Sequence, residues 1–170
     1  MAAQVSFDLK EVDAVRKMLA EAALDSNDRQ RLLGSIGVEM ESQTKERFGT
    51  QRSPDGESWK ALAQKTQDYY MSKGKGHRSL LVGEGLLRDS ITSEVQEGAS
   101  SVLVGATMEY AAVHQFGATI TPKTAKALAV PGYGMLRKVV IPARPYLGVS
   151  QNDAAVIASA VSEFLGRGFK

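Results

Sequence analysis

The two histidines, His77 and His114, are the side chains best suited to acid–base chemistry near neutral pH. A histidine that acts as a general base needs a nucleophile and an orienting carboxylate within reach. The acid nearest to His114 in sequence is Glu109, and the chain has no Gly-x-Ser-x-Gly elbow. We therefore interpret His114 as a structural side chain that bonds to the backbone and His77 as an exposed residue. A small hydrolase that uses His114 stays open as a rival function.

Other chemistries lack their ligands or nucleophiles. The chain contains no cysteine, which excludes disulfides, thiolate metal sites and a cysteine nucleophile, and it has no His-Glu-x-x-His run. Asp55 and Glu57 are close in sequence, but they lie at the turn that begins with Pro54, and we expect them to face water. The sequence thus predicts a protein that is not an enzyme and that has no cofactor and no metal site.

Charge is distributed unevenly along the chain. The formal net charge is +2, yet the window from Tyr110 to Asn152 carries +5 with no Asp or Glu, so the other residues carry −3. An electropositive surface suits an acidic protein or a phosphate backbone, although a solvated loop rich in lysine would show the same pattern. A basic, non-specific nucleic-acid-binding protein is therefore an alternative function, with phosphate contacts at Lys123, Lys126, Arg137 and Lys138.

The elements that would position these residues begin with helices. Apolar spacing predicts a first helix near residues 10–22 and a second at 28–48, with capping side chains at 25–28 and a stop at Gly49. Two glycines in the second helix, Gly34 and Gly37, favour a close helix contact there. Trp59 is expected to pack against a helix. Residues 69–79 are interpreted as a mobile basic loop.

Short extended segments follow. The pattern predicts strands at 91–95 and 101–105, a helical turn at 109–116, further extended pieces at 120–121, 127–130 and 139–141, and a final helix from an Asn152 cap to Gly166. The predicted class is α+β: two N-terminal helices, a small antiparallel sheet with an extended β arm, and a C-terminal helix packed on the sheet. We expect a single domain over 1–170, with a peripheral N-terminal helix at 1–24, a core at 25–117 and 141–166, and the arm at 118–140.

Membrane insertion and secretion are not expected. No apolar run approaches the ~20 residues that a membrane-spanning helix needs. The first ten residues lack the apolar segment of a secretory signal. We therefore expect no membrane partner and action in the compartment where the protein is made.

A series of motifs resembles the phage virion morphogenesis family, which includes the tail completion proteins of temperate tailed phages. The residues that carry the resemblance are Pro54-Asp55-Gly56 with Trp59, Leu80-Leu81, Gly85 to Ile91, Val104-Gly105, Tyr110-Ala111, His114 to Gly117 and Pro142 to Gly148. The resemblance runs from about residue 48 to 165, and Tyr146 stands where phenylalanine is usual. Residues 120–130 also resemble an arm of phage head–tail connection proteins. In those relatives the arm packs in a ring of identical subunits around the axis through which DNA passes.

The resemblance implies a structural protein rather than an enzyme. It would form a homo-oligomeric ring at the head–tail junction or tail end, as a tail completion protein, terminator or connector, assembled in the host cytoplasm and kept in the virion. Its partners would be further copies of itself, neighbouring neck or tail proteins and, by non-specific proximity, phage DNA.

Two sets of residues are expected to matter. The oligomer or partner contacts are Ile120, Lys123, Lys126, Leu128, Val130, Tyr133, Arg137, Lys138 and Arg144. The structural motif residues are Trp59, Tyr110, His114, Phe116, Gly117, Pro142 and Pro145. A guanidinium forms directional paired bonds, so Arg144 is expected to form a salt bridge or an inter-subunit hydrogen bond, with a local bond to a backbone carbonyl as the open alternative.

Overall fold

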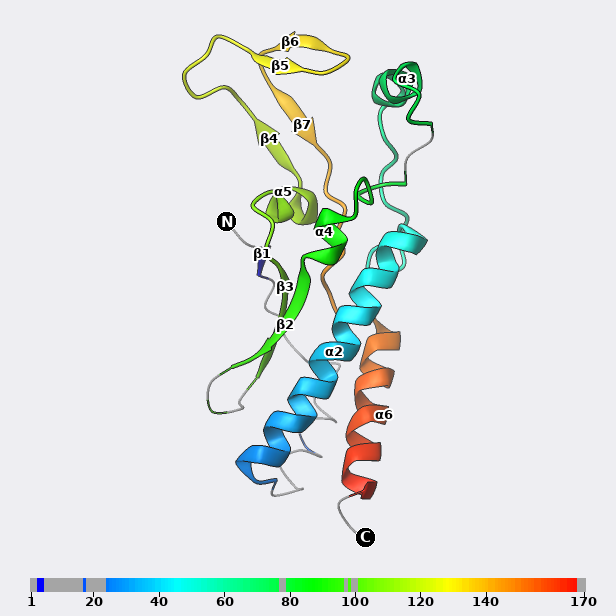
Figure 1. Cartoon of the computed structure of the whole chain (residues 1–170), viewed down its shortest axis with the longest axis vertical. Coiled ribbons are helices and arrows are strands. Elements are labelled where there is room, and N and C mark those ends of the chain that lie inside the picture. The colour runs from blue at the N-terminus through cyan, green and yellow to red at the C-terminus, as the bar shows by residue number, and fades with distance from the viewer. Residues whose placement is uncertain are drawn as a thin grey trace.

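The molecule is elongated, with two long helices at one end and a projecting pair of β ribbons at the other (Figure 1). The computed structural model describes residues 3–4, 17, 24–76, 79–96, 98 and 101–167. The predicted first helix near residues 10–22 lies outside the described residues, apart from residue 17. His77 also lies outside them.

Helix α2 (Ser26–Thr50) forms the spine of the molecule. It begins where expected, because the carboxylate of Asp25 accepts a hydrogen bond from the backbone N–H of Asp28 at 2.8 Å. The predicted stop at Gly49 is wrong. The helix continues to Thr50, and Gln51 ends it in the left-handed conformation, with φ of 56° and its N–H bonded to the carbonyl of Arg47.

One face of α2 covers a three-stranded antiparallel sheet, in the order β1-β3-β2. The strands are β1 (Ala3–Gln4), β2 (Ile91–Val95) and β3 (Val102–Ala106). A Cβ atom on Gly37 would lie 2.7 Å from the Oγ of Ser93, whereas one on Gly34 would meet nothing within 4 Å. The close contact predicted for these glycines is therefore made with the sheet rather than with a helix, and only by Gly37. This permits Glu41, one turn further along, to accept hydrogen bonds from the N–H and Oγ of Ser93 at 2.6 and 2.7 Å.

Helix α6 (Gln151–Arg167) packs beside α2 (Figure 1). Their shared apolar cluster is Leu32, Ile36, Met40, Ile157 and Val161, with Val102 and Val104 of β3 packed against it. The prediction of Asn152 as the N-cap is wrong, because Ser150 caps the helix. Its Oγ accepts from the N–H of Asp153 at 3.0 Å, and the Asp153 carboxylate accepts from the N–H of Ser150 at 2.6 Å, a reciprocal capping box. The helix also runs past Gly166 to Arg167.

A second apolar cluster lies where α2 ends. Its buried members are Phe48, Trp59, Leu80, Leu87, Ile91, Ala106, Ala111, Tyr146 and Leu147. The ring of Trp59 meets that of Phe48 edge-on, with centroids 5.5 Å apart, so the expected packing of Trp59 on a helix is confirmed. The two clusters join helices to an antiparallel sheet. The fold class is therefore α+β, with a C-terminal helix, as the sequence predicts.

The predicted basic loop at 69–79 is wrong in its first part. Helix α3 (Gln64–Ser72) includes Tyr69, and the chain turns only after Ser72. The short helix α4 (Leu86–Asp89) follows and leads directly into β2. The reason for the difference is tertiary: the side chain of Tyr69 packs against the backbone at Gly132, where an added Cβ would lie only 2.8 Å away. Composition alone carries no information about that contact.

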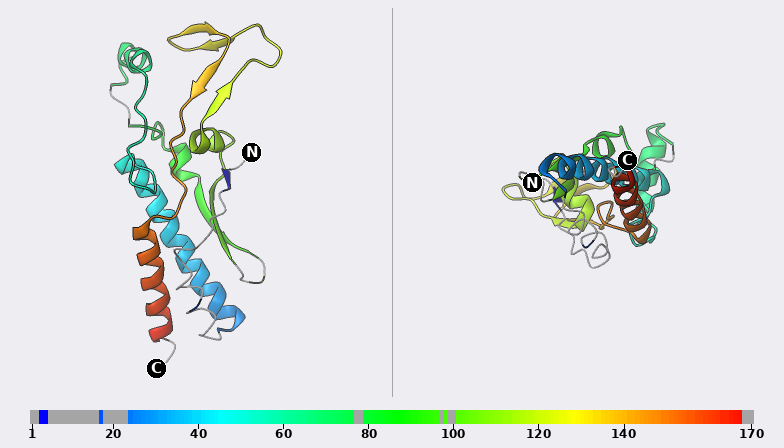
Figure 2. Two further views of the ribbon diagram at one scale, coloured as in Figure 1. Left: turned by 180° about the vertical axis from the view of Figure 1, so that it is seen from behind. Right: turned by 90° about the horizontal axis from the view of Figure 1, so that it is seen from below.

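Helix α5 (Ala111–Phe116) leads into the projecting arm, which consists of two β ribbons (Figure 2). Strand β4 (Ala118–Ile120) pairs antiparallel with β7 (Val139–Ile141), and β5 (Leu128–Val130) pairs antiparallel with β6 (Gly134–Leu136). The helical turn and three extended segments match the prediction, whereas β6 was not expected. No helix among the described residues is long and apolar enough to cross a membrane.

Candidate assembly interface

The arm is fixed to the body by a buried amide. The side chain of Gln115, the last but one residue of α5, is 5% exposed. Its Oε1 accepts hydrogen bonds from the backbone N–H groups of Tyr146 and Leu147, each at 3.0 Å, and its Nε2 donates to the carbonyl of Leu147 at 3.0 Å. Three bonds from one side chain therefore join the segment that enters the arm to the segment that leaves it.

The returning segment is held from the other side by a buried charge. Arg47 of α2 donates through Nη1 to the carbonyls of Tyr146 and Gly148 at 2.8 and 3.0 Å, and through Nη2 to the carboxylate of Asp153 on α6. Arg47 is 7% exposed and Asp153 is 1% exposed. Burial lowers the pKa of Arg47 from its ordinary value, and the charge of Asp153 opposes that shift. Because the guanidinium is paired and bonded on both branches, its burial is compensated.

The phenol of Tyr146 lies at the centre of this root. It is fully buried, packs on Phe48 with ring centroids 5.2 Å apart, and donates to the carbonyl of Ala111 at 3.2 Å. Burial, with a smaller contribution from Tyr110, raises the pKa of Tyr146 well above its ordinary range. The hydroxyl of Tyr146 is therefore accommodated in the apolar cluster because it has an internal acceptor.

The remaining sequence motifs converge on the same place. The indole N–H of Trp59 donates to the carbonyl of Pro145 at 2.7 Å. A Cβ on Gly148 would lie 2.3 Å from Cγ of Pro54, so the Pro-Asp-Gly turn packs directly on the chain that leaves the arm. Gly117 has φ of 72°, and a Cβ there would lie 2.8 Å from the backbone nitrogen of Ala143. The motifs that looked scattered in sequence thus form one structure, the root of the arm.

Arg144 also belongs to the root and not to the outer surface of the arm. It is 5% exposed, and its Nε and Nη2 donate to the carbonyls of Lys60 and Ala61 at 2.8 and 3.3 Å. Its backbone N–H donates to the carbonyl of His114 at 2.8 Å. The acceptors are backbone carbonyls, as in the alternative that the sequence left open, but they lie 84 and 83 residues away in sequence and are not local.

His114 faces an open cavity of about 340 Å³, whose lining includes Tyr70, Glu84, Tyr110 and Arg144. Within the described part of the chain, its Nδ1 is buried without a hydrogen-bond partner. Its backbone N–H donates to the carbonyl of Tyr110 at 3.4 Å, and its carbonyl accepts from the N–H of Arg144 at 2.8 Å. Burial, and secondarily the charge of Arg144, lower the pKa of His114. Both effects favour the neutral form of the imidazole. In the described residues no group of three or more His, Asp or Glu side chains is placed to hold a metal ion.

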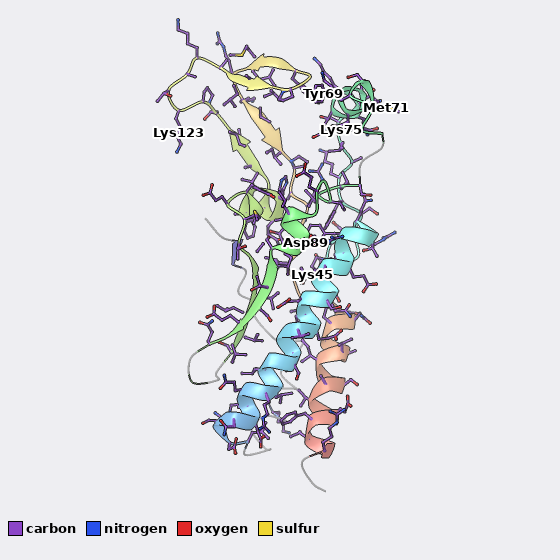
Figure 3. The ribbon with its side chains drawn as sticks, in the orientation of Figure 1. Lys45, Tyr69, Met71, Lys75, Asp89 and Lys123 are labelled. Atoms are coloured by element: carbon purple, nitrogen blue, oxygen red, sulfur yellow. The ribbon has the colours of Figure 1, made fainter. Side chains whose placement is uncertain are left out.

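The other expected contact residues lie on the arm itself. Ile120 is in β4, Lys123 and Lys126 are in the loop that follows it, Leu128 and Val130 are in β5, and Arg137 and Lys138 lie between β6 and β7. All four cations and Ile120 are exposed, whereas Leu128 and Val130 are half-buried between neighbouring segments. Figure 3 labels Lys123 on the outer loop, far from the body. The arm surface is thus basic, with apolar side chains interspersed.

Tyr133, also an expected contact residue, is used within the chain. Its hydroxyl lies 2.8 Å from Oγ1 of Thr66 in α3, and the Nζ of Lys65 lies 5.1 Å from its ring centroid. The tip of the arm is therefore bound to α3, and the arm is connected to the rest of the chain at both its root and its tip.

Three residues of the root were missed by sequence reasoning: Arg47, Gln115 and Asp153. Gln115 stands inside the His-Gln-Phe-Gly motif, and an amide in an otherwise apolar run was the one available signal. Arg47 and Asp153 are separated by 106 residues, and nothing local to either predicts the pair.

This arrangement defines a class of protein in which the sequence motifs build a scaffold and its projecting arm. Comparison with known proteins agrees. The model of the phage virion morphogenesis family matches residues 10–166, and the chain belongs to that family. It is accordingly a phage assembly protein.

Three relatives support the assignment. Protein G of Escherichia phage Mu, whose name provisionally gives it a role in capsid assembly, is 30% identical over 152 residues, covering 88% of each chain. Mu-like prophage FluMu G protein 2 of Haemophilus influenzae is 29% identical over 94% of this chain and 95% of its own length. FluMu G protein 1 of the same organism is 23% identical over 95% of this chain and 94% of its own length. No solved structure matches the chain.

Proposed function

We propose that this protein forms a homo-oligomeric ring at the head–tail junction or tail end of a tailed phage or prophage during virion assembly. The membership of a virion morphogenesis family supports a structural role, and the name of the phage Mu relative supports action in particle assembly. The ring and its position in the particle are the parts that we add.

The observation that carries the proposal is an open-edged ribbon that exposes apolar side chains. Among the described strands, β4 pairs only with β7, so both outer edges of this ribbon are unpaired. Val140 is 64% exposed, Phe116 at the root is 60% exposed and Met135 near the tip is 67% exposed. Unpaired strand edges and exposed apolar groups are what a subunit contact removes from water.

The contact is expected to be head-to-tail. A ribbon that projects from one side of a subunit meets a different surface on its neighbour, and such heterologous contacts close into a ring when the rotation fits. The buried root then has a mechanical role, because a contact at the arm sets the position of the neighbour only if the arm is held firmly to the body.

The test uses two valines of nearly equal exposure. Val140 lies in β7 and is 64% exposed, and Val38 lies on α2 and is 66% exposed. We expect Val140→Glu to yield monomers by native mass spectrometry and light scattering, and Val38→Glu to keep the wild-type oligomer. Both side chains face water and neither change opens a cavity, so both variants are expected to fold. Circular dichroism checks that they do.

Two results would overturn the proposal that the protein forms a ring. One is a wild-type protein that stays monomeric both in solution and when bound to isolated phage tails. The other is loss of the oligomer in both valine variants, which would mean that the contact is not specific to the arm. The position is tested in a phage lacking the gene: electron microscopy should show filled heads and free tails, and normally joined particles would contradict a junction role.

A further inference from the structure

The end of the molecule distal to α6 carries a concentrated positive charge that comes from two separate segments. We define this basic end as residues 64–76, which include α3 and the turn after it, and the arm at 118–140. Its cations are Lys65, Lys73, Lys75, Lys123, Lys126, Arg137 and Lys138, and its one carboxylate is Asp68. Seven cations and one acid give it a net charge of +6.

The two segments form one surface because they are in contact. The Thr66 hydroxyl meets the Tyr133 hydroxyl at 2.8 Å, and a Cβ on Gly132 would lie 2.8 Å from Cβ of Tyr69. Figure 3 labels Tyr69 and Lys75 on and just after α3, and Lys123 on the outer loop of the arm, all at the same end of the molecule. The sequence window from Tyr110 to Asn152 contains only four of these seven cations, so the structure enlarges the basic region beyond it.

These charges are not neutralised within the described chain. All seven side chains are exposed, and none of them belongs to a described ion pair. The opposite end differs: Arg31 pairs with Asp28, and Arg167 pairs with Glu163. The molecule is therefore electrostatically polarised along its length, with the uncompensated field at the basic end.

The chemistry of the cations favours a phosphate backbone over an acidic protein. Six of the seven are lysines, and lysine is depleted from the buried centres of protein–protein interfaces. Exposed lysines on flexible stems instead suit contacts to phosphates, which carry a regular charge and require no fixed side-chain geometry. We propose that the basic end binds the phosphate backbone of double-stranded DNA without reading its sequence. The proposal goes beyond the ring, since it concerns the surface of each subunit.

The test measures binding to a fluorescently labelled DNA duplex by anisotropy over a series of salt concentrations. The logarithm of the association constant falls with log salt by about 0.9 per neutralised phosphate, so four to seven contacts give a slope of about −4 to −6. We expect Lys73→Gln/Lys75→Gln and Lys123→Gln/Lys126→Gln each to make the slope shallower by about 2, and the combined variant by about 4. A second duplex of unrelated sequence should bind equally well.

The matched control is Arg31→Gln/Arg167→Gln. It removes the same charge from exposed side chains at the opposite end, and it should leave the slope unchanged. The oligomer mass of every variant is measured alongside, so that lost DNA binding in an intact oligomer is distinguished from a failure to assemble.

Several outcomes would overturn the proposal. The first is no DNA binding at low salt, and the second is an equal change of the salt slope in the control variant. The third is a change of the salt slope in the arm variant alone, which would mean that α3 is not part of the DNA-binding surface. Tighter binding to polyglutamate of equal charge than to the duplex would assign the surface to an acidic protein instead.

Discussion

Gln115 is the residue through which the root can be tested most directly. Replacing it with leucine keeps the approximate volume and removes the three hydrogen bonds that its side chain makes to the segment after the arm. The N–H groups of Tyr146 and Leu147 and the carbonyl of Leu147 would then be buried without their partner. Each such group costs about 1–3 kcal/mol.

The three groups together cost about 3–9 kcal/mol, and the added apolar burial of a leucine offsets about 1–3 kcal/mol of this, so the net loss for Gln115→Leu should be about 2–6 kcal/mol. That is a large fraction of the 5–15 kcal/mol that typically holds a domain folded. With a urea m-value of about 2 kcal/mol per molar, the midpoint should fall by about 2 M.

The assay is urea unfolding followed by the fluorescence of Trp59, whose indole bonds to Pro145 in the same root. Low protein concentration is needed because oligomerisation stabilises the folded state by mass action. The control is Gln43→Leu, which removes only a bond to Glu39 along α2 and should cost under about 1 kcal/mol. A Gln115→Leu variant within 1 kcal/mol of wild type would refute the reasoning that the amide holds the arm to the body.

Two further predictions concern the described chain. Gly37→Ala should destabilise the protein by about 1–3 kcal/mol in the same assay because its Cβ would lie 2.7 Å from the Oγ of Ser93. Gly34→Ala, in open space, should stabilise α2 by up to about 1 kcal/mol. Equal effects of the two substitutions would contradict the close packing of α2 on the sheet. Because burial lowers the pKa of His114, the unfolded chain binds a proton more readily, so this contribution to stability is complete above the unfolded pKa of about 6.5 and is lost as the pH falls below it. Replacing His114 with Gln should therefore reduce the loss of unfolding free energy between pH 7.5 and 5.5, and an unchanged loss would argue against it.

Local signals predicted those parts of the fold that local interactions determine. The cap at Asp25 follows from a short polar side chain before an apolar helical repeat, and the strand at Ile91–Val95 follows from β-branched residues between turn signals. The pattern predicts a cap at Asn152, whereas Ser150 caps the helix because it and Asp153 bond reciprocally to each other's backbone N–H. Helix α3 was not expected because the Lys-Gly-Lys-Gly run after it is typical of a loop. The residue that Tyr69 contacts, Gly132, lies far away in sequence, so no local pattern predicts the contact.

The root illustrates what sequence patterns alone leave unspecified. The motifs around Gln115 and Tyr146 were recognised as important, yet their shared hydrogen bonds exist only once the chain has left the arm and returned. The same holds for Arg47 and Asp153, which meet because α2 and α6 pack side by side. The sequence predicts a salt bridge, an inter-subunit hydrogen bond or a local backbone bond for Arg144. Its side chain instead bonds to the carbonyls of Lys60 and Ala61, which no local pattern connects with it.

The two ends of the arm nearly touch where they join the body, since an added Cβ on Gly117 would lie 2.8 Å from the nitrogen of Ala143. A segment whose ends meet behaves as an insertion, so its length and composition can change without moving α2, α6 or the three-stranded sheet, as long as the contacts of its tip with α3 are kept. The surface that we propose to contact a neighbouring subunit can therefore change through substitutions within the arm, while the residues that fix its base stay under a separate constraint.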